Sequence, residues 1–198
     1  MIKFINISNA DPFVRFKETY ANAQNNNQKS IEATSVSSYC HDKKEVNSRF
    51  VNLKYVDGED FIFFSNYNSK KAEEFNQHNQ ITALIYWNSI NTQIRIKATI
   101  KQTSTKYNES HFKTRSLEKN ALAISSDQSK VINSYEDVKK KFQKTLTKKN
   151  LNQCPIYWGG FAFRPYYFEF WKGHESRINK REVFEFTDNN WSRYILEP

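Results

Sequence analysis

A series of strand-like segments in hairpin order constrains the fold of this 198-residue chain more than any other feature. Between Gln93 and Ile100 apolar and polar residues alternate, which is the period-2 pattern of a strand with one buried face. Strands are also predicted over residues 49–56, 61–65 and 81–87, and the Asp57-Gly58 pair between the first two is typical of a tight hairpin turn. Aromatic strands follow over residues 157–163, 166–171, 183–186 and 191–196.

Helices are inserted between these strands and do not alternate with them. Asp11 at a cap and Pro12 in a first turn predict a helix start, so residues 1–30 form an N-terminal helix and loop. A short helix is predicted over residues 70–77 and a helical insertion over residues 109–150. This order argues against a doubly wound parallel sheet and favours a mainly β (α+β) fold, an antiparallel barrel with peripheral helices. No repeat or linker divides the chain, so residues 1–198 are expected to form a single domain.

The composition bounds the class of protein. A mean hydropathy of −0.82 is typical of disordered chains, but the aromatic fraction of 16% is far above what such chains carry and indicates a folded domain. No apolar run reaches the roughly 18–20 residues of a membrane helix, and the N-terminus lacks a secretory signal. Cys40 and Cys154 cannot build a disulfide framework and the four histidines are scattered, so we expect a cytoplasmic protein without a metal site.

The chain has a formal net charge of +9, and its densest basic stretch runs from Lys139 to Lys149. The apolar residues of this stretch recur at helical spacing, at Tyr135, Val138, Phe142 and Leu146. The pattern favours a solvated face of an amphipathic helix over a nucleic-acid-binding patch. Nucleic acid is therefore an unlikely partner.

A phosphate group would have to be bound by side chains, because the chain has four glycines and no nucleotide-binding fingerprint. Candidates are Arg49 and Lys54 on one strand and Ser65, Lys70 and Lys71 after the next, which a hairpin brings together. The alternative is that these are ordinary surface residues.

A second cluster joins the aromatic segments 157–161 and 168–173 to Arg177 and Arg181, which could lie beside a planar anion. The alternative for its aromatic residues is the core. The sequence shows no catalytic triad and no carboxylate pair, so in an enzyme a cofactor would carry the difficult step.

Six motifs occur in one order along the chain. They are Arg49-Phe50-Val51-Asn52-Leu53-Lys54; Phe64-Ser65-Asn66 with Ser69-Lys70-Lys71-Ala72; Gln93-Ile94-Arg95; Asp127-Gln128-Ser129; Trp158-Gly159-Gly160; and Glu169-Phe170-Trp171 leading to Arg177 and Arg181. In this order and spacing, the sequence resembles the pyridoxamine 5′-phosphate oxidase family of FMN-dependent enzymes from about residue 11 to residue 198.

The resemblance implies a homodimer of Greek-key split β-barrels with FMN at the subunit interface. It implies that Arg49, Ser65 and Lys71 contact the FMN phosphate, with Lys70 at a position where the family usually has arginine. The remaining cofactor-binding residues that it implies, some of them from the partner subunit, are Phe50, Val51, Asn52, Leu53, Lys54, Phe64, Gln93, Gln128, Ser129, Trp171 and Arg181.

The resemblance also implies a substrate site. The family binds the substrate phosphate with a lysine, a tyrosine, an arginine and a serine, and these positions are Lys54, His111, Arg115 and Lys119 here. Arg177 is expected over the substrate ring as a catalytic residue, and Asn179 stands where the family has a catalytic histidine. The C-terminal arginine of the family is Ile195.

The implied activity is oxidation of pyridoxamine or pyridoxine 5′-phosphate to pyridoxal 5′-phosphate, with O₂ as acceptor and H₂O₂ as product. One alternative is a flavin oxidase acting on another aromatic natural product. Another is a non-catalytic protein that binds FMN or pyridoxal phosphate.

Overall fold

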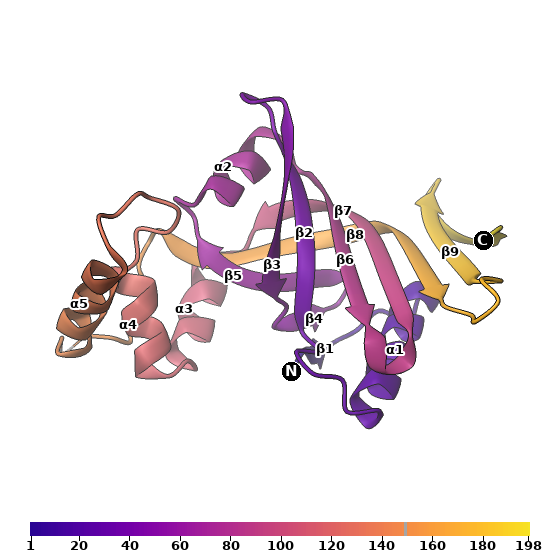
Figure 1. Ribbon diagram of the computed structural model, residues 1–198, viewed down its shortest axis with the longest axis horizontal. Helices are drawn as coiled ribbons and strands as arrows, with labels where there is room; N and C mark the ends of the chain where they lie inside the picture. Colours follow the sequence, from indigo (N-terminus) through magenta and orange to yellow (C-terminus); the bar gives the residue numbers. More distant parts are fainter. Residues whose placement is uncertain (149) are drawn as a thin grey trace.

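The computed structural model describes residues 1–148 and 150–198, in which ten strands form one sheet with helices around it (Figure 1). Only the end of the helical insertion and of the basic stretch, at Lys149, lies outside the described residues. In chain order the elements are β1 (Lys3–Ile5), α1 (Asp11–Asn25), β2 (Ala33–Cys40), β3 (Glu45–Asn52), β4 (Tyr55–Asp57), β5 (Asp60–Asn66), α2 (Lys70–Gln77), β6 (Gln80–Trp87), a short 3₁₀ helix (Asn88–Ile90), β7 (Thr92–Gln102), α3 (Thr105–Lys113), α4 (Leu117–Ser125), α5 (Tyr135–Leu146), β8 (Trp158–Lys172), β9 (Lys180–Thr187) and β10 (Asn190–Leu196).

The sheet curls round so that β3, at one end of the strand order, is joined by two residues to β4, next to the other end. Its main path runs β1-β4-β5-β8-β7-β6-β2-β3, and β9 and β10 extend from β8. The junction between β3 and β4 is Leu53-Lys54, where the Leu53 amide donates to Glu32 and the Lys54 amide donates to Ile62 of β5. The pairing is antiparallel except between β1 and β4, which confirms the mainly antiparallel α+β fold.

Two predicted strands have different bounds in the structure. The segment 49–56 is interrupted at Leu53-Lys54, because there the backbone leaves β3 to pair with β5. Conversely, the two aromatic segments 157–163 and 166–171 form one strand, β8. Pro165 lies within this strand at a register shift between Lys97 and Ala98, and a bulge is one of the places where a strand accommodates proline. The hairpin at Asp57-Gly58 is confirmed, with Gly58 at φ +58°.

Strands β1 and β2 were not predicted, and the helical segments also differ in detail. Helix α1 is capped by Ala10, so Asp11 is its first residue and not its cap, where a carboxylate still complements the helix dipole. The insertion begins at Thr105, before the predicted residue 109, and contains three helices. Each has a serine cap that accepts a backbone hydrogen bond: Ser104, Ser116 and Ser134. None of the helices in the described residues combines the length and the apolar character needed to cross a membrane.

Many of the aromatic residues belong to the hydrophobic core, a large part of which lies between α1 and the sheet. The ring of Phe16 lies 4.9 Å from that of Phe61 and 5.7 Å from that of Trp87, and Phe13 lies 5.4 Å from Phe168. All five side chains are 1% exposed or less. Burial of these large apolar surfaces is the main source of stability for the strands and for α1.

The basic helix α5 lies at the periphery, packed on α4. Of the four apolar residues predicted to share one face of α5, Val138, Phe142 and Leu146 are only half-buried and Tyr135 is 72% exposed. Its lysines pair with neighbouring acids, as a solvated face would: Lys139 with Glu136, Lys140 with Asp137, and Lys141 with Asp127.

Candidate cofactor and substrate site

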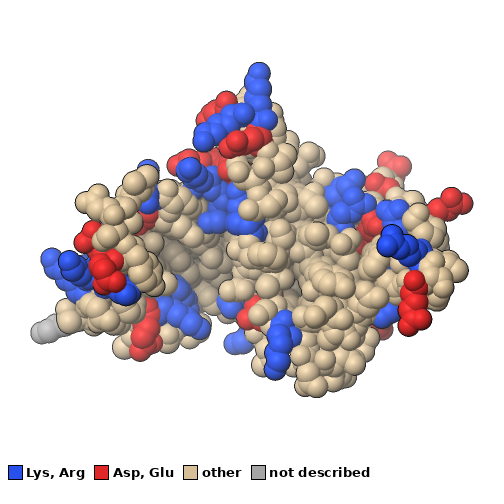
Figure 2. All heavy atoms as spheres, in the orientation of Figure 1, with Lys and Arg blue, Asp and Glu red and all other residues tan. Residues whose placement is uncertain are grey.

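Two adjacent cavities lie beside the strands, one lined in part by α3 and α4 and the other by α2, β3 and the loop after α4. The space-filling view is hollowed between the helices α3–α5 and the strands, with Lys and Arg at the margins (Figure 2). The larger, which we call the aromatic cavity, has a volume of about 620 Å³. The smaller, which we call the α2 cavity, measures about 500 Å³. Phe50, Lys71 and Gln128 line both. The aromatic cavity is lined by Met1, Lys3, Phe50, Val51, Asn52, Lys54, Tyr55, Phe64, Ser65, Lys71, His111, Thr114, Arg115, Ser116, Lys119, Gln128 and Trp158.

Lys71 is a buried cation without a carboxylate partner among the described residues. Its Nζ donates to Ser65 Oγ at 3.1 Å and to Ser69 Oγ at 3.3 Å, and both partners are neutral hydroxyl groups. Burial lowers the pKa of the Lys71 ammonium to about 8, assisted by the positive charge of Arg49 and opposed by Glu74. A buried ammonium group that is bonded only to hydroxyls is suited to binding an anion.

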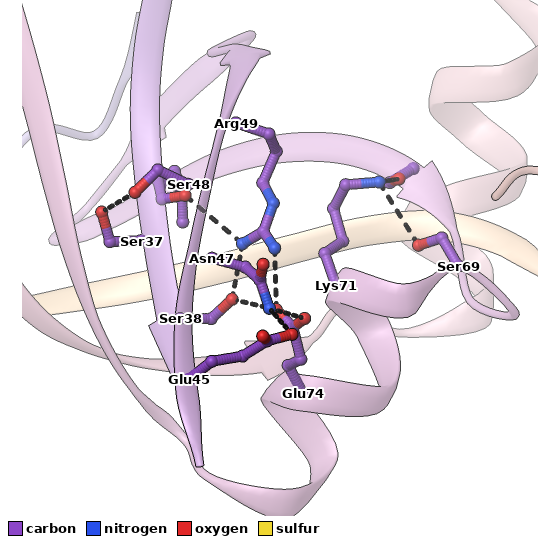
Figure 3. Close-up of polar contacts among 11 residues, drawn as sticks. Ser37, Ser38, Glu45, Asn47, Ser48, Arg49, Ser69, Lys71 and Glu74 are labelled. Carbon is purple, nitrogen blue, oxygen red and sulfur yellow. Dashed lines mark hydrogen bonds and ion pairs between the residues drawn. The ribbon is translucent and has the colours of Figure 1, made fainter. Parts of the chain in front are cut away.

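Arg49 projects from β3 toward the same place but is held by α2 (Figure 3). Its Nη2 is 2.7 Å from Glu74 Oε2, and it also donates to Ser38. Glu74 is buried, and it accepts further hydrogen bonds from Ser38 and from Asn47 Nδ2. This network and a hydrogen bond from Nη1 to the Val36 carbonyl at 3.4 Å fix the guanidinium group, and among the described residues its Nε has no partner and could donate to a ligand in the α2 cavity. The motifs did not single out Ser38 and Glu74.

The loop after α4 completes this cluster with an amide. Gln128 Oε1 accepts from Ser65 Oγ at 3.0 Å and from the Asn66 amide at 3.2 Å. Ser129 adopts φ +72° and lines the α2 cavity beside Lys70. The structure therefore brings together Arg49, Ser65, Lys70, Lys71, Gln128 and Ser129, as the resemblance implied.

Three parallel rings form a wall of the aromatic cavity. The imidazole of His111 stacks on Phe64 with 3.7 Å between centroids, and Phe64 stacks on Trp158 at 5.2 Å. His111 Nδ1 is hydrogen-bonded to Tyr55 Oη at 2.8 Å. Burial, together with the positive charges of Arg115, Lys54 and Lys3, lowers the pKa of His111 to about 4. At neutral pH the imidazole is therefore uncharged.

Arg115 presents an unpartnered donor. Its guanidinium lies 4.3 Å over the Trp158 ring and its Nη2 donates to the Lys119 carbonyl at 2.8 Å. Its Nη1 is buried without a hydrogen-bond partner. Buried donors are normally satisfied, so this nitrogen suits an anionic ligand.

In the part of the chain that the structure describes, the basic side chains of the aromatic cavity are not paired with carboxylates, although Glu32 lies within electrostatic reach of Lys54. Within the described residues no Asp or Glu lines this cavity, and none of its five basic side chains takes part in an ion pair: Lys3, Lys54, Lys71, Arg115 and Lys119. By contrast, Arg49, Arg95 and Arg181 each pair with a carboxylate. A cavity of this charge favours a ligand with several negative charges.

The Trp158-Gly159-Gly160 motif explains how α3 reaches this position. A Cβ atom at Gly159 would come 2.1 Å from Tyr67 Oη and 2.3 Å from Asn108 Nδ2. Asn108 of α3 instead accepts from the Gly160 amide at 2.8 Å and donates to Tyr67 Oη at 2.9 Å. The two glycines let α3 dock on β8, and α3 carries His111.

The other residues that the resemblance implied lie near the C-terminal end of β8, away from both cavities: Gln93, Trp171, Arg177, Asn179 and Arg181. Ser65 pairs with Gly159 of β8, whereas Gln93 pairs with Trp171 of the same strand. Twelve residues of strand correspond to about 40 Å at roughly 3.3 Å per residue. A single chain therefore does not bring Gln93 and Trp171 to the two cavities.

Arg177, Asn179 and Arg181 lie at the same far end, around the turn from β8 to β9. Arg177 is exposed at φ +60°, and its amide donates to the His174 carbonyl. Asn179 Oδ1 accepts from the His174 amide at 3.1 Å, which closes the turn. Arg181 Nε donates to the buried Glu169 at 2.8 Å. The motifs did not assign a role to Glu169, Tyr55 or Lys3.

Comparison with known proteins identifies the family. Residues 33–149 match the family described as "Pyridoxamine 5'-phosphate oxidase", and residues 158–198 match "Pyridoxine 5'-phosphate oxidase C-terminal dimerisation region". The chain belongs to the pyridoxamine 5′-phosphate oxidase family. The second match supports a homodimer.

Curated relatives of this family match the chain over nearly its whole length. The pyridoxine/pyridoxamine 5′-phosphate oxidase of Leptospira biflexa is 34% identical over 191 residues, which are 95% of this chain and 89% of the relative. The enzyme of the same name from Colwellia psychrerythraea is 32% identical over 193 residues, 96% of this chain and 88% of the relative. The protein is thus an FMN-dependent oxidoreductase of the pyridoxamine 5′-phosphate oxidase type.

Two solved structures share the fold, the FMN-binding split barrel. PhzG from Burkholderia lata, in complex with tetrahydrophenazine-1-carboxylic acid, has a TM-score of 0.88 and 22% identity, covering 96% of this chain and 93% of that one. A pyridoxamine 5′-phosphate oxidase-related, FMN-binding protein from Nostoc punctiforme has a TM-score of 0.79 and 12% identity, covering 92% and 97%.

Proposed function

We propose that this protein oxidises pyridoxamine 5′-phosphate or pyridoxine 5′-phosphate to pyridoxal 5′-phosphate, with FMN as cofactor, O₂ as acceptor and H₂O₂ as product. The observation that carries the proposal is the aromatic cavity, in which unpaired cations surround a wall of stacked rings. A phosphorylated pyridine ring matches both features. The curated relatives named for this reaction support the same substrate.

The residues around Lys71 fit the phosphate of FMN. Lys71, Ser65 and Arg49 supply a buried ammonium group, a hydroxyl and a fixed guanidinium, and Lys70 adds charge at the mouth of the α2 cavity. The ring system would be lined by Phe50, Val51, Asn52, Lys54 and Phe64. The side chain of Leu53 is buried in the core, so Leu53 would contact the ring system only through its backbone. When bound, FMN supplies the acceptor for the two electrons that leave the substrate and passes them to O₂.

A second anion site would hold the substrate phosphate. Lys54 and Arg115 are the lysine and the arginine with which the family binds the substrate phosphate. The buried Nη1 of Arg115, which has no hydrogen-bond partner among the described residues, would donate to this phosphate. Lys119 contributes a further positive charge. His111 replaces a hydroxyl donor with a ring that stacks on Phe64.

The site is completed by the partner subunit. In one chain Gln93, Trp171, Arg177 and Arg181 lie too far from Lys71 to contact the same cofactor. In a symmetric dimer the far end of one copy can cover the cavities of the other. We infer that FMN binds between the two subunits and that these four residues come from the partner.

Within this site the chain supplies position and charge. Arg177 would hold the substrate ring, since its guanidinium is exposed and has no ion-pair partner among the described residues. Asn179 cannot carry a proton near neutral pH, and it closes the turn that presents Arg177. The role of Asn179 is therefore to position Arg177.

The free thiols of Cys40 and Cys154 suit a reducing cytoplasm.

A second candidate is oxidation of another aromatic anion. PhzG shares the fold and is known in complex with tetrahydrophenazine-1-carboxylic acid, and a carboxylate could also bind Arg115.

An anaerobic mixing experiment separates the candidates. FMN-loaded protein is mixed with pyridoxamine 5′-phosphate, with unphosphorylated pyridoxamine, or with a dihydroaromatic carboxylate, and bleaching of the flavin is followed. The proposal expects fast bleaching by the phosphorylated amine. Bleaching only by the carboxylate would favour the second candidate, and no bleaching by any would indicate a binding protein.

A further inference from the structure

Strand β1 brings a basic residue to the aromatic cavity that the sequence motifs did not include. Lys3 lines this cavity with Lys54, His111 and Arg115. We propose that Lys3 is a further anion-binding residue of the substrate site and that its ammonium group contacts the phosphate of a phosphorylated aromatic substrate. The substrate class rests on the proposed function, whereas the anion site does not.

The position of Lys3 is fixed by its neighbours on both sides. The Ile2 amide donates to Tyr20 Oη at 3.0 Å, and the Lys3 amide donates to the Lys54 carbonyl at 2.9 Å. The ring of Phe4 packs against Tyr20 at 5.2 Å. Successive side chains of a strand point to opposite sides, so Phe4 enters the core and Lys3 faces away from it, toward the cavity.

The groups around Lys3 and His111 are mostly basic or phenolic; the acids within electrostatic reach are Glu32, near Lys54, and Asp57, near Tyr107. His111 is surrounded by Arg115 after α3, Lys54 before β4 and Lys3 on β1, and by the phenol groups of Tyr55 and Tyr107. The positive charge of Lys3 is close enough to contribute to the lowered pKa of His111. Lys3 has no ion-pair partner among the described residues.

The consequence is a surplus of charge at the substrate phosphate. Lys3 and Lys119 add two cations to Lys54 and Arg115, so four basic side chains line the part of the aromatic cavity that would hold one phosphate. A dianion relieves the repulsion among them, whereas a neutral ligand does not. The surplus should therefore increase the preference for phosphorylated over unphosphorylated ligands.

The test measures anion binding and does not depend on turnover. Inorganic phosphate and pyridoxal 5′-phosphate are titrated into FMN-loaded protein by calorimetry, with wild type, Lys3→Met, Lys3→Arg and the control Lys17→Met, which removes an exposed lysine of α1 outside both cavities. We expect Lys3→Met to weaken binding of both ligands about five- to tenfold, as loss of one charged contact in a partly exposed site would. Lys3→Arg and Lys17→Met should bind as wild type does.

A second readout separates binding from folding. In Lys3→Met the pKa of His111, followed by NMR, should rise because one neighbouring positive charge is gone. Unchanged affinity for both ligands, or loss of affinity in Lys17→Met as well, would overturn the proposal. If Lys3→Met weakens phosphate binding but wild type does not oxidise pyridoxamine 5′-phosphate, the Lys3 site stands and the proposed function fails.

Discussion

At the scale of single residues, the site is defined by buried donors that the folded chain leaves without an anionic partner. Lys71 bonds only to hydroxyl groups, and one nitrogen of Arg115 bonds to nothing in the described residues. Burying such groups costs free energy unless a ligand compensates. These residues are therefore placed for binding and weaken the unliganded fold.

Replacing Lys71 should weaken cofactor binding. Lys71→Met removes a buried charge-assisted hydrogen bond, so the Kd for FMN should rise roughly 10- to 100-fold. Because the pKa of free Lys71 is about 8, the ammonium group loses its proton as the pH rises through that value. The wild-type Kd for FMN should then increase above pH 8, and the Lys71→Met Kd should not. Quenching of flavin fluorescence measures both, with Lys17→Met as the control.

His111 should take up a proton when an anion binds. Its pKa of about 4 in the free protein will rise toward its usual value once a phosphate neutralises Lys54 and Arg115. Affinity for phosphate should thus increase, relative to His111→Tyr, as the pH falls from 7 toward 5. Calorimetry in two buffers of different ionisation enthalpy measures the uptake. Equal proton uptake by wild type and His111→Tyr would contradict this role.

At the scale of elements, the helices α3–α5 are positioned by short polar signals. Three serine caps start them, and Gly159 and Gly160 let Asn108 dock α3 on β8. This docking sets the position of His111, because His111 lies one turn further along α3.

A methyl group at Gly159 should disturb this docking. Gly159→Ala should destabilise the fold by about 1–3 kcal/mol and weaken phosphate binding, since Tyr67 and Asn108 must move. Gly58→Ala is the control: Gly58 adopts φ +58° in the hairpin between β4 and β5 and lines neither cavity, so alanine should destabilise the protein by backbone strain without affecting phosphate binding. Denaturant unfolding and phosphate titration measure the two effects.

The elements also show what the sequence could predict. The alternation of apolar and polar residues predicted both ends of β7 to within two residues, and the Asp57-Gly58 pair predicted the hairpin between β4 and β5. Both signals are local in the sequence. Strand β2 was missed, because its buried face carries the polar residues Thr34 and Ser38 on either side of Val36, so the segment shows no apolar alternation.

The resemblance predicted Arg49, Ser65 and Lys71 as contacts of the FMN phosphate; the structure brings these three residues together, and their role toward FMN stays a prediction. Lys3 and Glu74 could not be found in this way, since only the folded chain brings them to the cavities.

At the scale of the whole molecule, the proposed site divides into two separate halves within one chain. Ser65, which pairs with Gly159, lies beside the start of β8 and Trp171 lies at its end, about 40 Å away along the strand. The dimerisation region that the C-terminal residues match contains Trp171, Arg177 and Arg181. A two-fold dimer would therefore hold two composite sites.

Mixing two defective variants should restore activity. Lys71→Met should lose FMN, and Arg177→Ala should keep FMN but turn over slowly or with a raised KM. In randomly mixed dimers of the two, half are hybrids and each hybrid has one intact site, so activity should recover to about a quarter of wild type. No recovery after subunit exchange would show that each site is built within one chain. Loss of flavin from Arg177→Ala would contradict its assignment to the substrate.

The central claim is oxidation of a phosphorylated pyridine substrate, and one assay tests it most directly. FMN-loaded protein is given pyridoxamine 5′-phosphate while O₂ consumption, H₂O₂ and pyridoxal 5′-phosphate are followed together. We predict one pyridoxal 5′-phosphate and one H₂O₂ for each O₂ consumed, with far slower turnover of unphosphorylated pyridoxamine. A flavin-loaded protein that consumes no O₂ with pyridoxamine or pyridoxine 5′-phosphate would contradict the claim.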